Sequence, residues 1–190
     1  SFLAQGVDLD LAVLPDGDLV DHRYDVTVDR FSSPRVDNGQ LHLAGAIERL
    51  DAAALGRLLA MRTEARWPND RQSWTGVFSA ASRFRLQEFL MEADGERARL
   101  EFECHLGDTI DAGTGPGELL RALQGQGTVE LSEGFLPMMI VNGNDPAAVE
   151  SLVAIGYLRR IEDRLVAEVR LGGGLVTING LPIPLPLPAD

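Results

Sequence analysis

The strongest constraint on the fold is a pair of alternating segments, residues 84–91 and 96–106, that flank the dipeptide Asp94-Gly95. Alternation of apolar and polar residues is typical of a strand with one buried face, and Asp-Gly is among the clearest two-residue hairpin signals. The apolar face of the second segment consists of Ala98, Leu100, Phe102, Cys104 and Leu106. The sequence therefore predicts an antiparallel hairpin here.

The first fifty residues repeat this pattern. Residues 7–13 alternate Val, Leu, Leu and Val with polar or small residues, which predicts a strand with one buried face. The turn cluster Pro15-Asp-Gly-Asp18 leads to a second strand through residues 24–28, and Asp37-Asn-Gly39 leads to a third through residues 41–47. The N-terminal part is thus predicted to be an antiparallel meander.

The period then changes to that of a helix over residues 50–62. Asp51 is a good N-cap, and Leu50 and Leu55 occupy the two positions of a hydrophobic staple. A last helix is predicted from Pro146 to Gly156, with Asp145 as its cap. Core positions against the sheet are predicted at Leu55, Leu58, Leu59, Val149, Leu152 and Val153.

Residues 118–124 predict a further short helix, closed by Gly125, and residues 136–141 a helical turn. Strands are expected at 128–131, 157–161, 165–171 and 175–178. The predicted fold class is α+β, a long curled antiparallel β-sheet of meanders and hairpins with about three short helices covering one face. Residues 1–190 are expected to form a single domain, with two sub-units of one continuous sheet (1–112 and 113–190) as a variant of that organisation.

The composition argues against several functions. The chain carries 17 basic and 29 acidic residues, a net charge of −12, which disfavours nucleic-acid binding. It contains no lysine, which excludes a P-loop lysine and a Schiff-base enzyme. No apolar run is long enough to span a bilayer, so no transmembrane segment is predicted in this chain.

The reactive residue types are sparse and separated. Cys104 is the only cysteine and is expected to point inward as a small apolar group. His22, His42 and His105 lie on different predicted strands and are expected to point outward. Residues 142–145 are explained by a helix cap rather than a cation site, and the glycine-rich run 113–117 follows no buried parallel strand. We therefore predict no catalytic, cofactor-binding or metal-binding residues, and no enzyme.

Four segments carry a resemblance to a known family: residues 47–55, Leu136-Pro137, Gly156-Tyr-Leu158 and, above all, residues 174–182 (Gly-Leu-Val-Thr-Ile-Asn-Gly-Leu-Pro). They resemble the C-terminal half of the YdgA-like proteins, proteobacterial envelope proteins of unknown function that are typically anchored by one N-terminal helix. The resemblance implies a periplasmic or cell-envelope location. The anchor and first half expected of that family are missing, which favours a cleaved or shortened form.

Two functions are compatible with these features. The first is a non-catalytic cell-envelope protein whose curved sheet binds an apolar ligand, such as a lipid, or a protein partner. The alternative is a structural or accessory subunit of a larger assembly or homo-oligomer, docking through sheet edges and the proline-rich tail. That tail cannot join a sheet as a central strand, so an edge path or polyproline II is expected. Its predicted apolar contacts are Leu181, Ile183, Leu185 and Leu187.

Overall fold

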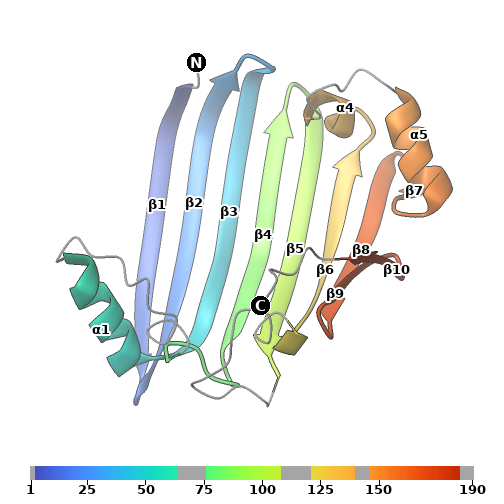
Figure 1. Ribbon diagram of the computed structural model, residues 1–190. Helices are drawn as coiled ribbons and strands as arrows, with labels where there is room; N and C mark the ends of the chain where they lie inside the picture. The colour runs from blue at the N-terminus through green and yellow to red at the C-terminus, as the bar shows by residue number, and fades with distance from the viewer. Residues whose placement is uncertain (1–2, 64–75, 108–120, 140–145, 185–190) are drawn as a thin grey trace.

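The computed structural model describes residues 3–63, 76–107, 121–139 and 146–184 (Figure 1). They form a ten-stranded antiparallel sheet in which neighbouring strands follow chain order, and only β7 lies off this path, paired with β8. The predicted antiparallel meander is confirmed. The strands are β1 Leu3–Asp16, β2 Leu19–Ser33, β3 Val36–Asp51, β4 Arg83–Ala93, β5 Glu96–Leu106, β6 Leu123–Ser132, β7 Arg159–Ile161, β8 Arg164–Gly172, β9 Leu175–Ile178 and β10 Leu181–Pro184.

Tight turns connect several of these strands. Asp94 and Gly95, both at positive φ (51° and 88°), join β4 to β5, which confirms the predicted hairpin. The link between β1 and β2 is the two-residue turn Gly17-Asp18, with Gly17 at φ 63°. Positive φ at these positions gives the turn the twist that antiparallel strands require.

The helices are short: α1 spans Ala52–Thr63, α4 spans Phe135–Met139 and α5 spans Pro146–Ile155. Asp51 caps α1, because its Oδ1 accepts a hydrogen bond of 2.6 Å from the backbone N–H of Ala54. Leu50 and Leu55 pack in one apolar cluster, as the staple requires, whereas the side chains of Leu58 and Leu59 lie outside the described part. The fold consists mainly of the sheet, whereas the predicted α+β class gave the helices a larger share.

α5 ends as its sequence predicts. Gly156 has φ 95° and donates its N–H to the carbonyl oxygen of Val153 (3.0 Å), while Tyr157 donates to Leu152 (2.9 Å). Val149 is buried, and Leu152 and Val153 pack against the cluster around Leu165 of β8. The predicted contact stripe of this helix is therefore confirmed, although its predicted cap at residue 145 lies outside the described residues.

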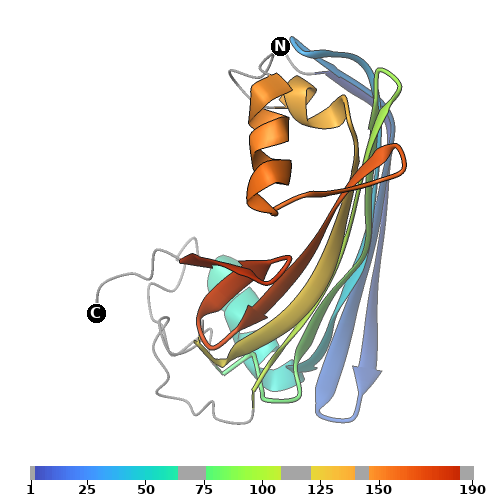
Figure 2. The same cartoon turned by 90° about the vertical axis from the view of Figure 1, so that its right-hand side faces the viewer.

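The sheet is strongly curved, and all described helices lie on its concave side (Figure 2). Two glycines allow aromatic side chains to lie flat on the neighbouring strand at the same level of the sheet. A Cβ on Gly45 would lie 2.3 Å from the hydroxyl of Tyr24, and one on Gly127 would lie 2.7 Å from the ring of Phe102. Register shifts next to Gly45 in β3 and after Leu86 in β4 add bulges at this level. Bulges and glycines together are the usual means of bending a sheet.

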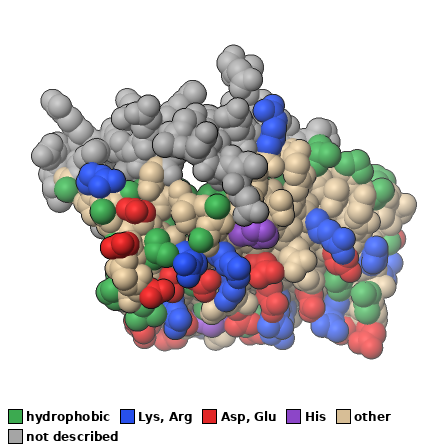
Figure 3. All heavy atoms as spheres, turned by 90° about the horizontal axis from the view of Figure 1, so that it is seen from below, with side chains coloured by type: hydrophobic (Ala, Val, Ile, Leu, Met, Phe, Trp, Pro, Cys, Tyr) green, Lys and Arg blue, Asp and Glu red, His purple; other side chains and the backbone are tan. Residues whose placement is uncertain are grey.

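The two faces of the sheet differ in chemistry. The convex face carries charged side chains of both signs, which Figure 3 shows interspersed along one side of the molecule. The concave face is apolar, but its buried residues form three separate clusters rather than one continuous core. One lies around Leu50 and Val77, a second around Val28 and Phe31, and a third around Leu165 beneath α5.

Two sequence predictions about the strands and helices are wrong. The face of β1 that was expected to be buried is exposed, because β1 is an edge strand and none of the helices that the structure describes covers it; Leu11 is 64% exposed. Gly125 does not close a helix but lies within β6 beside Cys104, and residues 118–120 fall outside the described part. The sheet runs without a break from β5 to β6, so the described strands of both proposed sub-units share one sheet.

Candidate functional site

The middle of the concave face is an apolar strip that we call the trough. It is built from two neighbouring rows of paired residues that cross the strands. Its residues are Leu9 and Leu11 (β1), Tyr24 and Val26 (β2), Leu43 (β3), Leu86 and Phe89 (β4), and Leu100 and Phe102 (β5). Every one of them is half-buried or exposed, so the trough is an apolar surface and not part of a closed core.

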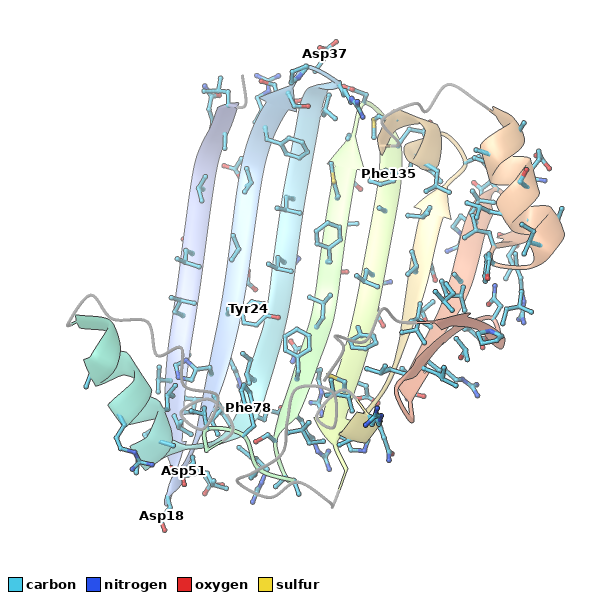
Figure 4. All side chains as sticks on the ribbon, in the orientation of Figure 1. Asp18, Tyr24, Asp37, Asp51, Phe78 and Phe135 are labelled. Carbon is cyan, nitrogen blue, oxygen red and sulfur yellow. The ribbon has the colours of Figure 1, made fainter. Side chains whose placement is uncertain are left out.

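The apolar clusters border the trough. Ala54 and Leu55 of α1 pack with Val20 and Leu50 toward one end of the strands, and Met138 of α4 packs with Val28 and Phe31 toward the other. Figure 4 places Tyr24 between these borders, with Phe78 below it and Phe135 above it. Among the described elements no helix crosses the middle of the face (Figures 1 and 2).

A small cavity of about 180 Å³ opens beside the trough near the end of β4 and β5. Its apolar lining includes Ile47, Phe78, Phe84, Cys104 and Leu123. Phe84 and Cys104 pair across the sheet one row below Leu86 and Phe102, so the cavity continues the trough. Burial raises the pKa of the Cys104 thiol despite a backbone hydrogen bond at Phe84, and the uncharged thiol acts here as a small apolar group, as expected.

A larger hollow of about 610 Å³ lies on the convex face and is lined by Arg85, Glu101, Glu103 and Arg170, among others. Its charged groups already have protein partners: Arg85 contacts Glu48 at 3.4 Å, and Gln126 donates to Glu103 at 3.1 Å. Cross-strand pairing of this kind is an ordinary use of charged residues on the exposed face of a strand. We therefore regard the convex hollow as a solvated surface and the apolar concave side as the candidate site.

The histidines are dispersed, as predicted, but they do not all point outward. His42 lies on the convex face, where Nε2 is 3.1 Å from Asp25 and Nδ1 is 3.0 Å from Glu88. The hydrogen bond to Asp25 raises the pKa of His42; burial opposes this shift, and Glu88 adds to it. His22 pairs with Ile47 and lies on the concave side, which corrects the expectation, whereas His105 is exposed on the convex side. Among the described residues, no group of three or more His, Cys, Asp or Glu side chains is arranged so that it could hold a metal ion.

The predicted docking residues of the tail are only partly described. Leu181 and Ile183 lie in β10, which pairs with β9 at the edge of the sheet as expected for a proline-containing strand, and both are half-buried. Leu181 lies beside the end of α5, since a Cβ on Gly156 would lie 3.3 Å from Leu181 Cδ1. Leu185 and Leu187 lie outside the described residues, so a docking role for this segment stays a prediction.

Sequence reasoning found the apolar face but missed the trough. The residues concerned were assigned to strands with one buried face, and no local pattern distinguishes a covered face from an uncovered one. The number of helices relative to strands could have indicated the trough, because three short helices cannot cover a sheet of ten strands.

Comparison with known proteins gives no relative: no family model, no curated protein and no solved structure matches this chain. Within the described residues, every helix is too short or too polar to cross a membrane. The functional argument therefore rests on the geometry of the concave face.

Proposed function

We propose that this chain binds an elongated apolar ligand, such as the acyl chain of a lipid, along the trough. The observation that carries the proposal is a band of aliphatic and aromatic side chains that crosses the concave face without being buried. Monomeric soluble proteins rarely leave large contiguous apolar surfaces exposed, and where they do the surface usually binds something.

The dimensions support an elongated ligand. The trough crosses the five strands β1 to β5, and at about 4.8 Å between neighbouring strands its width is about 19 Å. The cavity of about 180 Å³ is smaller than a typical small-molecule site, so it would take one end of a chain while the remainder lies in the trough. Each buried methylene contributes about 0.8 kcal/mol, so a long chain bound in this way gains substantial affinity.

The proposed role is a non-catalytic one in the cell envelope. Long-chain amphiphiles are abundant there, and the resemblance of residues 174–182 to the YdgA-like proteins supports that location. The arrangement at the trough fits ligand holding, because the one polar group among the trough residues is the Tyr24 hydroxyl, and the Cys104 thiol in the adjoining cavity is protonated. Neither supplies a charged nucleophile.

The direct test is a titration of the purified chain with cis-parinaric acid, whose fluorescence rises in an apolar environment, followed by displacement with palmitate. Native mass spectrometry of the chain purified from its source cells reports any bound lipid. We expect saturable one-site binding and displacement. Absence of saturable binding, with no lipid retained in the mass spectrum, would refute the proposal.

A pair of matched variants localises the site. Val26→Thr places a hydroxyl in the trough with little change in shape, whereas Val166→Thr makes the same change on the convex face of β8. Covering a hydroxyl without a partner costs about 1–3 kcal/mol, so the Val26→Thr variant should bind at least about fivefold more weakly. The convex control should bind as the wild type does, and equal losses in both would place the ligand elsewhere.

A further inference from the structure

Strand β1 is a long open edge. Residues 7–16 pair with β2 without a break in register, and among the described strands none lies on the other side of β1. Ten residues of strand span about 33 Å. Unpaired edges of this length are templates for adding a further strand, and folded proteins normally protect them.

The turn between β1 and β2 shows which backbone groups are free. In a two-residue hairpin the closing pair, here Asp16 and Leu19, is hydrogen-bonded, and bonded and non-bonded pairs alternate from it. The N–H and C=O groups of Asp8 and Asp10 therefore point toward β2. Those of Val7, Leu9, Leu11 and Val13 point to the open edge, and Pro15 belongs to the same outward set, where its missing N–H breaks no bond.

The opposite end of the sheet is protected by contrast. Its last strand, β10, has four residues and contains Pro182 and Pro184, which have no N–H to donate. The apolar side chains of β1 are also available: Val7, Leu9, Leu11 and Val13 are each between 55% and 64% exposed on the concave side. β1 thus offers both backbone partners and an apolar row that continues the trough.

Charge indicates what kind of strand fits. β1 carries Asp8, Asp10 and Asp16 and no basic residue. Asp10 stands directly opposite Asp25 of β2, a like-charge pair, and Arg23 of β2 stands opposite Ala12 rather than opposite an aspartate. On the free side, Asp8 and Asp10 would form the non-hydrogen-bonded pairs of a new ladder, in which side chains lie closest.

A second copy of the chain is a poor occupant of this edge. Pairing β1 with β1 would bring Asp8 and Asp10 of one copy against those of the other, with Asp25 one strand away on each side. Like charges directly opposite one another destabilise a strand pair, and the chain carries a net charge of −12.

We propose that β1 binds a strand of another protein in which apolar residues alternate with arginine or lysine. The apolar residues extend the concave face next to Val7, Leu9, Leu11 and Val13, and the basic residues face Asp8 and Asp10 on the convex side. This interaction uses the backbone edge of β1, whereas ligand binding uses the side chains of the trough; the two meet at Leu9 and Leu11.

The test uses a synthetic nine-residue peptide that alternates Val or Leu with N-methyl-arginine. In the proposed ladder the arginine N–H groups point away from β1, so methylating them blocks self-association of the peptide but not docking. We expect saturable binding by fluorescence anisotropy, with slower amide hydrogen exchange at Leu9 and Leu11. A control peptide methylated on its apolar residues should not bind, because it lacks the donors that face β1.

Two further comparisons test the charge argument. A peptide with N-methyl-glutamate in place of arginine should bind at least about tenfold more weakly, since each opposite-charge pair is worth up to about 1 kcal/mol and like charges oppose binding. Asp8→Asn combined with Asp10→Asn should weaken arginine-peptide binding about tenfold without lowering the melting temperature, because both side chains are exposed and Asp10 stands opposite the like charge of Asp25. Glu92→Gln, an exposed convex-face change on β4, serves as the matched control and should leave binding unaltered.

Each alternative gives its own result. Equal binding of both charged peptides, or protection of amides in β2 to β5 without protection of those in β1, would overturn the proposal. So would sedimentation of the free chain as a dimer, which would make a second copy the occupant of the edge. Protection of the β1 amides by phosphatidylcholine vesicles but not by the arginine peptide would indicate a membrane surface instead and would equally refute it.

Discussion

The β1 end and the β8 end of the sheet have the same alternating strand pattern, but their apolar side chains are exposed at the β1 end and buried at the β8 end. Leu165 in β8 is fully buried, while Leu9 in β1 is 56% exposed, although both are apolar residues on the concave side of alternating strands. The difference lies in the helices: Val149, Leu152 and Val153 of α5 pack onto the β8 end, and β1 has no comparable cover among the described elements. Alternation selects which side chains share a face, and a second layer decides whether that face is buried.

The covered end is held by apolar contacts beneath α5, whereas β1 is held by its ladder with β2, and the strands next to β1 combine buried apolar clusters with convex-face polar pairs. Between β2 and β5 the convex side carries a chain of contacts from Asp25 to His42, Glu88, Arg99 and Glu101. Exposed ion pairs contribute little individually, at most about 1 kcal/mol each. The two ends should therefore respond differently to the same kinds of change.

The largest expected effect is at the covered end. Leu165→Ala should lower the free energy of unfolding by about 2–5 kcal/mol, since it removes a fully buried side chain from beneath α5. Urea unfolding followed by circular dichroism measures the change. Leu11→Ala, the matched change at the uncovered end, should cost no more than about 0.5 kcal/mol because that side chain is 64% exposed. A similar loss in both variants would mean that the uncovered end is in fact packed.

The next effect concerns the curvature that both ends share. Gly45→Ala should cost about 1–3 kcal/mol, because the new Cβ would lie 2.5 Å from the carbonyl oxygen of Arg85, a backbone atom that cannot move aside. Gly172→Ala is the matched control in β8, where nothing lies within 4 Å of the added carbon. It should be neutral or slightly stabilising, since alanine restricts the unfolded chain. Thermal melts of both variants provide the measurement, and a neutral Gly45→Ala would contradict a tight bend at this level.

The sequence predicted the strands and their hairpins well because these depend on local signals. The turns at Asp94-Gly95 and the cap at Asp51 involve residues close in the chain, and the structure has them as expected. Gly125 was misassigned for the opposite reason. Its position beside Cys104 of β5 depends on a strand about twenty residues away, which a local reading of a glycine after a short leucine-rich segment does not include.

The side chain of Asn179 forms hydrogen bonds that connect three segments of the covered end. Its side chain accepts a hydrogen bond from the N–H of Glu168 (3.0 Å) and donates to the carbonyl oxygens of Gly156 (3.2 Å) and Tyr157 (3.1 Å). It thus links the turn before β10 to β8 and to the end of α5. Asn179→Ala should cost about 1–2 kcal/mol through these lost bonds and the positive φ of 50°.

A glycine at the same position separates the two causes. Asn179→Gly keeps the backbone conformation and removes only the hydrogen bonds, so its loss measured by urea unfolding should be smaller than that of the alanine variant. In the Asn179 variants, amide hydrogen exchange should be faster than in the wild type in α5 and β10, and unchanged in β1 to β3. Uniformly faster exchange throughout the chain would indicate that the two ends unfold as one unit.

The candidate site was less predictable than the fold. The trough depends on the pairing of five strands and on the few helices above them, and no segment of the sequence contains that information. The open edge was foreseen only in general terms, as docking through sheet edges. The alternation of residues 7–13 predicted a buried face, and the exposure of β1 emerged only from its place at the end of the strand order.

The smallest expected effect is a pH dependence confined to the uncovered end. The pKa of His42 is raised in the folded state, first by its hydrogen bond to Asp25 and further by Glu88, so the folded chain binds the proton more tightly than the unfolded chain. The resulting stabilisation is fully present below the unfolded pKa of about 6.5 and is lost as the pH rises through the higher folded value. Removing His42 should therefore matter in mildly acidic solution and cease to matter in alkaline solution.

The corresponding experiment compares wild type with His42→Gln by urea unfolding from pH 5 to pH 9. We expect the variant to be less stable at pH 5 by at most about 1 kcal/mol, the range of exposed ion pairs, and the gap to close as the pH rises. Hydrogen exchange should place the acid-dependent difference in β2, β3 and β4, where Asp25, His42 and Glu88 lie, and not beneath α5. A pH-independent gap would mean that glutamine disturbs packing rather than charge. An equal acid-dependent change of exchange in β8 would show that the convex-face contacts stabilise the whole sheet. The covered and uncovered ends would then not differ in what stabilises them.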